Sequence, residues 1–139
     1  YKIVKPSFVF VHVYSSKDRS WRVFSWGCAF KANSSFTTSG NSLFYVSERT
    51  VVRINISTGS QEQEYEMKDQ QFLTNSASTV VGNTLVNFGG HEGQCTSRCL
   101  RLCNLDTSEQ FVYKLNDIAC MQFPQLFALS GEEFVLCDS

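Results

Sequence analysis

The feature that most constrains the fold of this 139-residue sequence is an internal repeat. Three positions in short segments rich in Ser, Thr and Asp are each followed, 25 residues later, by a glycine. The pairs are Ser15 with Gly40, Ser57 with Gly82, and Asp106 with Gly131. Successive glycines are 42 and then 49 residues apart. A period of ~40 to 50 residues is typical of repeats made of four short strands, whereas paired-helix repeats recur at ~34. The sequence therefore predicts an array of β-sheet units.

The residue types within the first repeat predict four strands. β-Branched and aromatic side chains, which favour strands, occur in residues 42–48 and 50–57. Shorter candidate strands flank them at residues 34–39 and 61–67. The segment Ser57-Thr58-Gly59 marks a turn before the last strand.

The second repeat predicts the same four strands. Its candidate strands are residues 77–81, 84–88, 98–105 and 110–115. The Glu, Gln, Lys and Met residues of segment 62–71, in the first repeat, favour a helix. The repeat aligns that segment with residues 110–115, which have a strand pattern, so we predict a strand in both places.

The same alignment divides the chain into four parts, and the expected fold class is all-β with antiparallel four-stranded repeats. We expect residues 1–33 to supply the two outer strands of one unit, 34–74 and 75–120 to form whole units, and 121–139 to supply the two inner strands of the next. Leu43 and Leu85 hold the same apolar place in successive repeats. Both are therefore expected to point into the packing between sheets.

One interval of the repeat contains seven extra residues, which fall between Gly82 and Asn104. Insertions in repeat folds project as loops from one face, often the face that binds partners. We expect glycines to leave this loop mobile and polar side chains to form its tip. The sequence therefore predicts a site for a macromolecular partner here. The predicted contacting residues are Gly90, His91, Glu92, Gly93, Gln94 and Arg98.

A resemblance to kelch repeats is carried by the segment Val86-Asn87-Phe88-Gly89-Gly90. It resembles their strand-plus-diglycine signature, in which the glycines let neighbouring backbones approach closely. The first unit has Ser47-Glu48 at this place and the third has Asp138-Ser139. The resemblance implies about three blades of a kelch-like β-propeller. Because a closed ring needs about four to eight blades, the remaining blades must come from a longer chain or from oligomerisation.

Other phrases are similar to the F-box associated domains of plants, a kelch-related propeller family. Residues 11–22 (VHVYSSKDRSWR) are similar to a strand-turn-strand phrase of that family, and residues 40–45 and 52–56 are similar to its next phrase. The likeness covers about the first half of the chain. It implies a protein-interaction module, the substrate-recognition propeller of an F-box ubiquitin ligase subunit.

Composition argues against several other kinds of partner. Twelve basic residues balance thirteen acidic ones, and no block of like charge could follow a nucleic-acid backbone. The longest apolar run, near residues 8–14, is far shorter than the roughly 20 residues that cross a bilayer. The first apolar stretch also lacks the charged leader of a signal peptide. We therefore expect neither nucleic acid nor membrane as a partner.

The six cysteines are too unevenly placed to form the disulfide framework of a small secreted domain. This pattern favours a reducing compartment, the cytoplasm or the nucleus. Two triplets of the N-glycosylation type, beginning at Asn33 and Asn55, point instead to secretion.

The sharpest local pattern is a histidine and three cysteines at successive spacings of four: His91, Cys95, Cys99 and Cys103. Four such ligands could complete a tetrahedral zinc site. The repeat, however, assigns residues 98–105 to a strand, on which fourth neighbours lie roughly 13 Å apart, too far for one metal. Cys103 is then a small core residue. A disulfide between Cys95 and Cys99 is the alternative in an extracellular protein.

Motifs for catalysis are absent from the sequence, which has only two histidines and neither a nucleophile elbow nor a phosphate-binding glycine loop. We predict no enzymatic activity, no metal and no cofactor. A fragment of a kelch-type enzyme, or a metal-binding protein using residues 91–103, is the alternative. Tyr14, Trp21 and Trp26 are expected to pack between units, with an aromatic binding patch as the other interpretation.

Overall fold

The computed structural model describes residues 7–28, 34–68 and 70–138, and every helix or strand among them is a β-strand. All strand pairs in these ranges are antiparallel, which confirms the predicted all-β class. No helix in the described ranges is long and apolar enough to cross a membrane. The strands are β1 (Ser7–Ser15), β2 (Ser20–Cys28), β3 (Ser35–Ser39), β4 (Ser42–Ser47), β5 (Thr50–Asn55), β6 (Gln61–Glu66), β7 (Ala77–Val81), β8 (Thr84–Phe88), β9 (His91–Glu92), β10 (Cys95–Thr96), β11 (Cys99–Asn104), β12 (Gln110–Lys114), β13 (Pro124–Ala128) and β14 (Phe134–Asp138).

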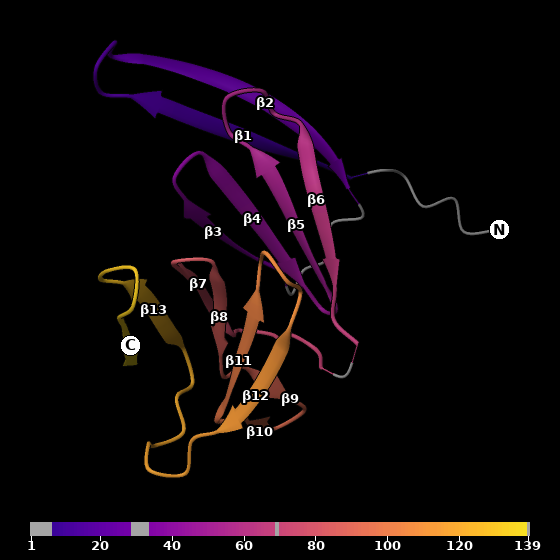
Figure 1. The fold of residues 1–139 in the computed structure, drawn as a ribbon, viewed down its shortest axis with the longest axis vertical. Coiled ribbons are helices and arrows are strands. Elements are labelled where there is room, and N and C mark those ends of the chain that lie inside the picture. The colour runs from indigo at the N-terminus through magenta and orange to yellow at the C-terminus, as the bar shows by residue number, and fades with distance from the viewer. Residues whose placement is uncertain (1–6, 29–33, 69, 139) are drawn as a thin grey trace, which may run out of the picture.

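Two four-stranded sheets form the centre of the molecule (Figure 1). The first sheet has the order β3-β4-β5-β6, and the second sheet has the order β7-β8-β11-β12. The short hairpin β9–β10 is inserted between β8 and β11. Strands β1 and β2 form a two-stranded sheet at one end of the chain, and β13 and β14 form another at the other end. The four strands predicted in each repeat are present, including β6 in the segment whose composition favours a helix.

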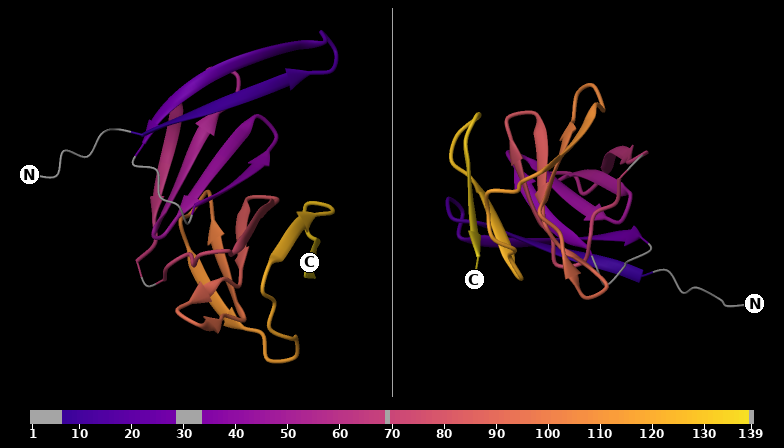
Figure 2. Two further views of the ribbon diagram at one scale, coloured as in Figure 1. Left: turned by 180° about the vertical axis from the view of Figure 1, so that it is seen from behind. Right: turned by 90° about the horizontal axis from the view of Figure 1, so that it is seen from below.

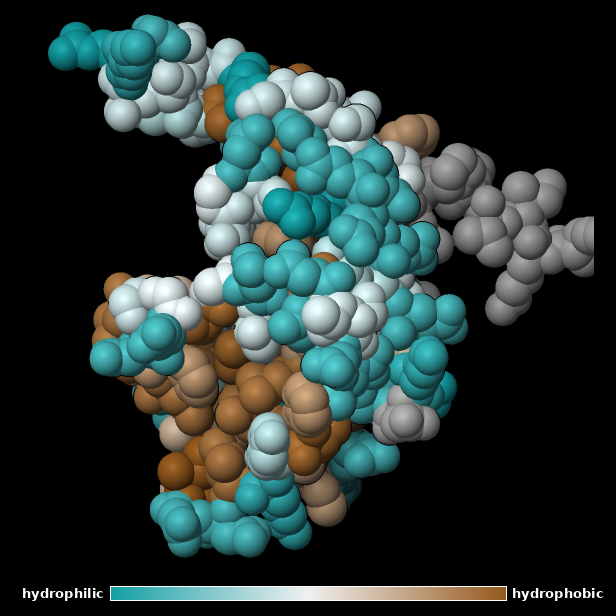
Figure 3. Space-filling view, viewed as in Figure 1, coloured by the Kyte–Doolittle hydropathy of each residue, from teal (hydrophilic) through white to brown (hydrophobic). Residues whose placement is uncertain are grey.

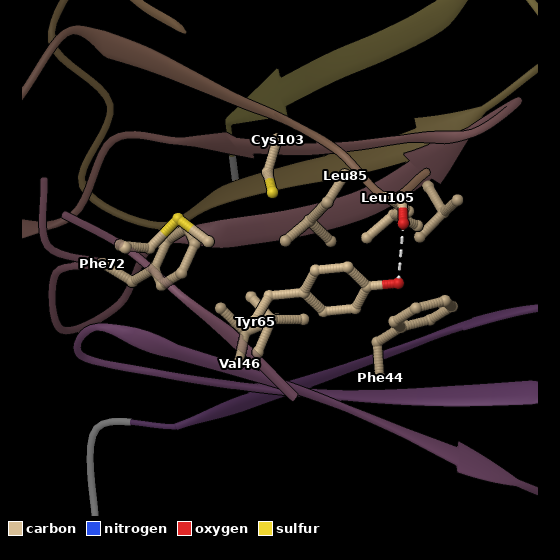
Figure 4. Close-up of a cluster of buried hydrophobic side chains, with 10 residues drawn as sticks. Phe44, Val46, Tyr65, Phe72, Leu85, Cys103 and Leu105 are labelled. Carbon is tan, nitrogen blue, oxygen red and sulfur yellow. Dashed lines mark hydrogen bonds between the residues drawn. The ribbon is translucent and has the colours of Figure 1, made fainter. Parts of the chain in front are cut away.

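The sheets pack face to face, and an apolar cluster fills each of the three seams between neighbouring sheets. The first seam joins β1–β2 to the first sheet, the second joins the two four-stranded sheets (Figure 4), and the third joins the second sheet to β13–β14. Representative side chains are Trp26 and Tyr45 in the first seam, Phe44 and Leu85 in the second, and Phe88 and Leu126 in the third. Both faces of each four-stranded sheet therefore carry apolar side chains.

Leu43 and Leu85 both point into this packing, as predicted. Leu43 is 8% exposed and lies in the first seam, whereas Leu85 is 1% exposed and lies in the second. Each leucine therefore faces the sheet that precedes its own. The next residues, Phe44 and Val86, face the following sheet, because neighbouring side chains on a strand point to opposite faces.

The repeat also appears in the hydrogen bonds of two equivalent turns. Asn55 Oδ1 accepts bonds from the backbone N–H groups two and three residues ahead, at 2.8 and 3.1 Å. Asn104 Oδ1 accepts the same pair of bonds in the second sheet, at 2.9 and 3.0 Å. The residue four positions after each asparagine has positive φ, 72° at Gly59 and 63° at Ser108. The β5–β6 and β11–β12 connections are therefore the same capped turn.

The glycines that define the period do not all occupy the same turn. Gly40 and Gly82 lie in equivalent two-residue turns, between β3 and β4 and between β7 and β8, with φ of 57° and 58°. Gly131 also lies between two paired strands, but the turn is longer because β14 begins only at Phe134. Gly131 is not among the residues of positive φ. All three glycines therefore lie between the first and second strands of their units, as the repeat predicts, and only the length and conformation of the turn differ at Gly131.

The first strands of successive sheets lie side by side. Strand β7 contacts β3 of the preceding sheet and β13 of the following one. Figure 2 shows this arrangement from two further sides. The stack is therefore held together along one edge by β3, β7 and β13.

Both ends of the stack present apolar side chains. The outer face of the β1–β2 hairpin carries Phe8, Phe10, Tyr14, Trp21 and Val23, which are between 50% and 68% exposed. Tyr14 and Trp21 pack against each other on this face, with ring centroids 5.1 Å apart. Of the three aromatic residues expected between units, only Trp26 lies in a seam.

At the opposite end, partly buried apolar residues continue the third seam to the surface. Figure 3 shows an apolar area of the surface beside β13. The residues that continue the seam are Leu100, Leu102, Leu115, Ile118, Met121 and Leu136.

Candidate functional site

The seven-residue insertion forms the β9–β10 hairpin, which projects from the end of the second sheet. His91 pairs with Thr96 and Glu92 pairs with Cys95. The turn of the hairpin consists of Gly93, with a φ of 63°, and Gln94. Of the six residues predicted to contact a partner, Glu92, Gly93 and Gln94 are exposed at this tip.

Gly90, at the base of the hairpin, is buried and has a φ of 96°. A Cβ atom at this position would lie 2.5 Å from Cβ of Leu73 and 2.9 Å from the carbonyl oxygen of Thr74. The backbone of the hairpin and the segment before β7 therefore approach so closely that only glycine fits. The expectation that Gly90 is a mobile surface residue is wrong, because its conformation and its neighbours hold it in place.

His91 connects the hairpin to two other segments, the one before β7 and the one before β13. Its backbone N–H donates to the carbonyl of Thr74, 2.8 Å away. Its ring nitrogen Nε2 lies 3.0 Å from the carbonyl oxygen of Gln122, and the ring packs edge to face near Phe123. His91 is half-buried as a result, and its imidazole anchors the hairpin.

Arg98 ends the insertion and is also half-buried. Its Nε donates to the sulfur of Cys120 at 3.1 Å, and its carbonyl accepts a bond from the backbone of Leu115 at 3.0 Å. Hydrogen bonds with Thr96 and with Arg98 lower the pKa of the exposed Cys120 thiol. The hairpin is thus connected to the segment between β12 and β13 through both main-chain and side-chain contacts.

Beneath the hairpin lies a buried polar network centred on Arg101, which is 6% exposed. Its Nη1 donates to Oδ1 of Asn87 at 3.0 Å and to the carbonyl of Gly89 at 2.9 Å, and its Nη2 donates to Oγ of Ser97 at 3.2 Å. Burial lowers the pKa of Arg101, although the nearby Cys99 and Glu92 oppose the shift. Because Gly89 and Ser97 stand at the two ends of the insertion, Arg101 holds the base of the hairpin together.

Sequence reasoning missed Arg101 and Asn87 as members of the site, although the repeat held a signal. Asn87 and Arg101 are cross-strand partners in the second sheet. The equivalent partners in the first sheet are Tyr45 and Val52, counted from the turn glycines and from the capping asparagines. An apolar pair in one unit has thus been replaced by a fully buried amide and a cation in the unit that carries the insertion.

Two grooves flank the hairpin. The larger, of about 510 Å³, lies between the hairpin and the neighbouring ends of β11 and β12, and its walls include Glu92, Arg98 and Lys114. The smaller, of about 240 Å³, lies against the segment that precedes β7, and its walls include Phe72 and His91. Glu92 borders both grooves, so the tip of the hairpin forms the ridge between them.

The histidine and three cysteines at spacings of four do not form one cluster. Cys95 is exposed on the hairpin, Cys99 is half-buried at the start of β11, and Cys103 is buried in the second seam (Figure 4). Burial raises the pKa of the Cys103 thiol. Among the described residues, no group of three or more His, Cys, Asp or Glu side chains could hold a metal ion. Cys95, Cys99, Cys103, Cys120 and Cys137 are all free thiols.

Of the two glycosylation-type triplets, the one at Asn33 begins outside the described residues. Asn55 uses its side chain inside the protein, since Nδ2 donates to Oε1 of Glu62 at 2.8 Å and Oδ1 caps the β5–β6 turn. This side chain therefore has a structural role.

No protein-family model matches the sequence, and the search of curated proteins finds no significant match.

Proposed function

We propose that this chain is a protein-interaction module built from about three blades of a kelch-like β-propeller, with residues 34–74 and 75–120 as whole blades. Three observations support this architecture. The four-stranded sheets stack face to face, their first strands β3, β7 and β13 adjoin along one edge, and the same capped turn recurs in both sheets. Repetition of one sheet about a common edge is how propellers are built.

The β9–β10 hairpin is the surface that we propose contacts a macromolecular partner. The observation that carries this proposal is that the second sheet has Asn87–Arg101 where the first sheet has the buried Tyr45–Val52 pair, and that Arg101 holds both ends of the insertion. A loop fixed at its base loses little conformational entropy on binding. The exposed tip supplies polar groups for hydrogen bonds with a protein.

The resemblance of residues 11–22, 40–45 and 52–56 to plant F-box associated domains gives this module a specific role. We propose that it recognises substrate proteins for an F-box ubiquitin ligase, without catalysis, cofactor or metal. The five cysteines that the structure describes as free thiols are compatible with the cytoplasm or nucleus, where such ligases work and where disulfides are rare.

Within the described residues, the end sheets β1–β2 and β13–β14 have two strands each, and no further strand pairs with their edges. Together with the apolar outer face of β1–β2, these edges favour pairing with further strands. We propose that the remaining blades come from a longer chain or from oligomerisation. Light scattering of the purified 139-residue chain tests this, since a strictly monomeric, fully soluble species that binds no hydrophobic dye would contradict it.

The partner site is tested by changing the hairpin tip without touching its base. The variant Glu92→Ala/Gln94→Ala removes two exposed side chains and leaves the packing of Gly90 and the hydrogen bonds of His91 and Arg101 intact. Wild type and variant are used as immobilised baits in a cell extract, and the captured proteins are compared by quantitative mass spectrometry. We expect at least one protein to be lost from the variant.

The matched control is Gln61→Ala/Glu109→Ala, which removes the same two chemical groups from exposed positions on β6 and in the β11–β12 turn. Both variants should unfold at the wild-type temperature. Equal capture by all three baits would refute the partner site, as would equal losses from the tip variant and its control.

A further inference from the structure

The two walls of the larger groove beside the hairpin come from different segments of the chain. Glu92, Thr96, Ser97 and Arg98 come from the hairpin and its base, and Lys114 and Asn116 come from the end of β12 and the residues after it. Hydroxyl and amide side chains therefore line a space of about 510 Å³. A space of this size accommodates a short peptide segment or a few side chains.

Positive charge in the walls of this groove lacks carboxylate partners. Arg98 uses Nε to bind Cys120, and its terminal nitrogens make no hydrogen bond or ion pair within the described part of the chain. Lys114 lies opposite Cys99 in the sheet, is exposed, and likewise has no ion-pair partner among the described residues. Among the residues that the structure describes, Glu92 is the one acidic side chain that lines the groove.

A third positive charge lies just beneath the groove. The guanidinium group of Arg101 donates to Oγ of Ser97, whose side chain borders the groove, and its other acceptors are an amide and a carbonyl oxygen. All of these acceptors are neutral, so the three hydrogen bonds do not neutralise the charge of Arg101, on which the carboxylate of Glu92 acts only through space. A buried charge acts at longer range than an exposed one, since less water screens it.

We propose that this groove receives an acidic segment of the protein partner, with aspartate or glutamate side chains between Arg98 and Lys114. The terminal nitrogens of Arg98 can hold a carboxylate through two parallel hydrogen bonds. Lys114 adds a point charge on the facing wall, and Thr96, Ser97 and Asn116 supply further donors. This proposal rests on the partner site proposed for the hairpin, and it assigns the chemistry of the segment that binds there.

The test uses hexaglutamate as the probe and hexaglutamine as its neutral counterpart, with the ¹⁵N-labelled chain observed by two-dimensional NMR. Hexaglutamate is expected to shift the backbone signals of Thr96, Ser97 and Lys114. Raising the salt concentration from about 50 to about 500 mM should weaken the effect, because exposed charges are then screened. Lys114→Glu is expected to weaken binding by about fivefold or more.

The matched control is Lys17→Glu, which makes the same charge change at an exposed residue in the β1–β2 turn and should leave the affinity within about twofold. Equal shifts with hexaglutamine, equal shifts with inorganic phosphate, or no shifts at all would each overturn the acidic-segment assignment. If the tip variant loses its partner while Lys114→Glu captures it normally, the hairpin site stands and the acidic segment is refuted. If both variants capture normally, the hairpin site itself is refuted.

Discussion

The hydroxyl group of Tyr65 on β6 donates a hydrogen bond to the main-chain carbonyl of Leu105, 2.8 Å away across the second seam (Figure 4). Tyr65 is 3% exposed and Leu105 is 5% exposed, so water has little access to this bond. Burial raises the pKa of Tyr65 against the opposing effect of Arg53, so this hydroxyl stays protonated to a higher pH than that of an ordinary tyrosine. The contact joins the outer strand of the first sheet to the capped turn of the second.

Replacing Tyr65 by Phe should destabilise the protein by about 1–3 kcal/mol, because the carbonyl of Leu105 would remain buried without a donor. Urea unfolding measures this change. Tyr113→Phe removes a hydroxyl from a tyrosine that is 51% exposed and should change stability by less than about 0.5 kcal/mol. Equal effects of the two substitutions would contradict the role assigned to the Tyr65 hydroxyl.

Ser108 tests whether the two capped turns are equivalent, because it has a positive φ of 63° where the first sheet has Gly59. Ser108→Gly should stabilise the protein by about 0.5–1 kcal/mol, since glycine adopts this conformation without a steric penalty. Ser25→Gly, at an exposed position in β2, should be neutral or destabilising. A Ser108→Gly variant with a lower melting temperature than the wild type would argue against the equivalence of the two turns.

Arg101→Ala should cost about 2–4 kcal/mol, because it leaves the buried oxygens of Asn87 and Gly89 and the half-buried Oγ of Ser97 without their donor. Hydrogen exchange should also become faster at the backbone N–H groups of Ser97 and Cys99, since the base of the hairpin would open. Arg49→Ala provides the control at an exposed arginine of the β4–β5 turn. Unchanged exchange in the hairpin of the Arg101 variant would show that the network does not hold it.

The pKa of Cys120 gives a pH-dependent prediction. Hydrogen bonds from Thr96 and Arg98 stabilise the thiolate and lower this pKa, so Cys120 should be alkylated by iodoacetamide at a lower pH than an ordinary thiol. Thr96→Val and Arg98→Ala should each move the midpoint of the labelling curve to higher pH. Mass spectrometry of the labelled peptide measures the midpoint, and Cys103 should remain unlabelled while the chain is folded. A midpoint unaffected by both substitutions would refute the contact.

Much of the fold could be predicted because it follows from local patterns. β-Branched and aromatic runs specified β4, β5 and β8, and the repeat correctly extended the strand assignment to β6 against its helix-favouring composition. The apolar places of Leu43 and Leu85 followed from the same alignment. The place of Gly131 before β14 followed from its distance to Asp106, but the greater length of the turn around it did not, because the period fixes the position of a glycine and not where the next strand begins.

The candidate site was predicted only in part, because spacing reveals an insertion but not how its base is held. Exposure of Glu92 and Gln94 followed from their polarity. The burial of Gly90 depends on its contact with Leu73, which belongs to a segment outside the insertion. The pairing of Asn87 with Arg101 could have been found by comparing the two repeats position by position. The exposure of Trp21 could not, since either face of a β-hairpin can carry aromatic residues.

The most direct test of the partner site is hydrogen–deuterium exchange of this chain, alone and with a protein that the wild type captures and the tip variant does not. The structure predicts slower exchange in residues 91–98 in the complex, because the partner would cover the hairpin. Residues 105–109, in the turn at the opposite end of the second sheet, should exchange at the same rate in both states. Protection of residues 105–109 with no change in residues 91–98 would contradict the proposed interface.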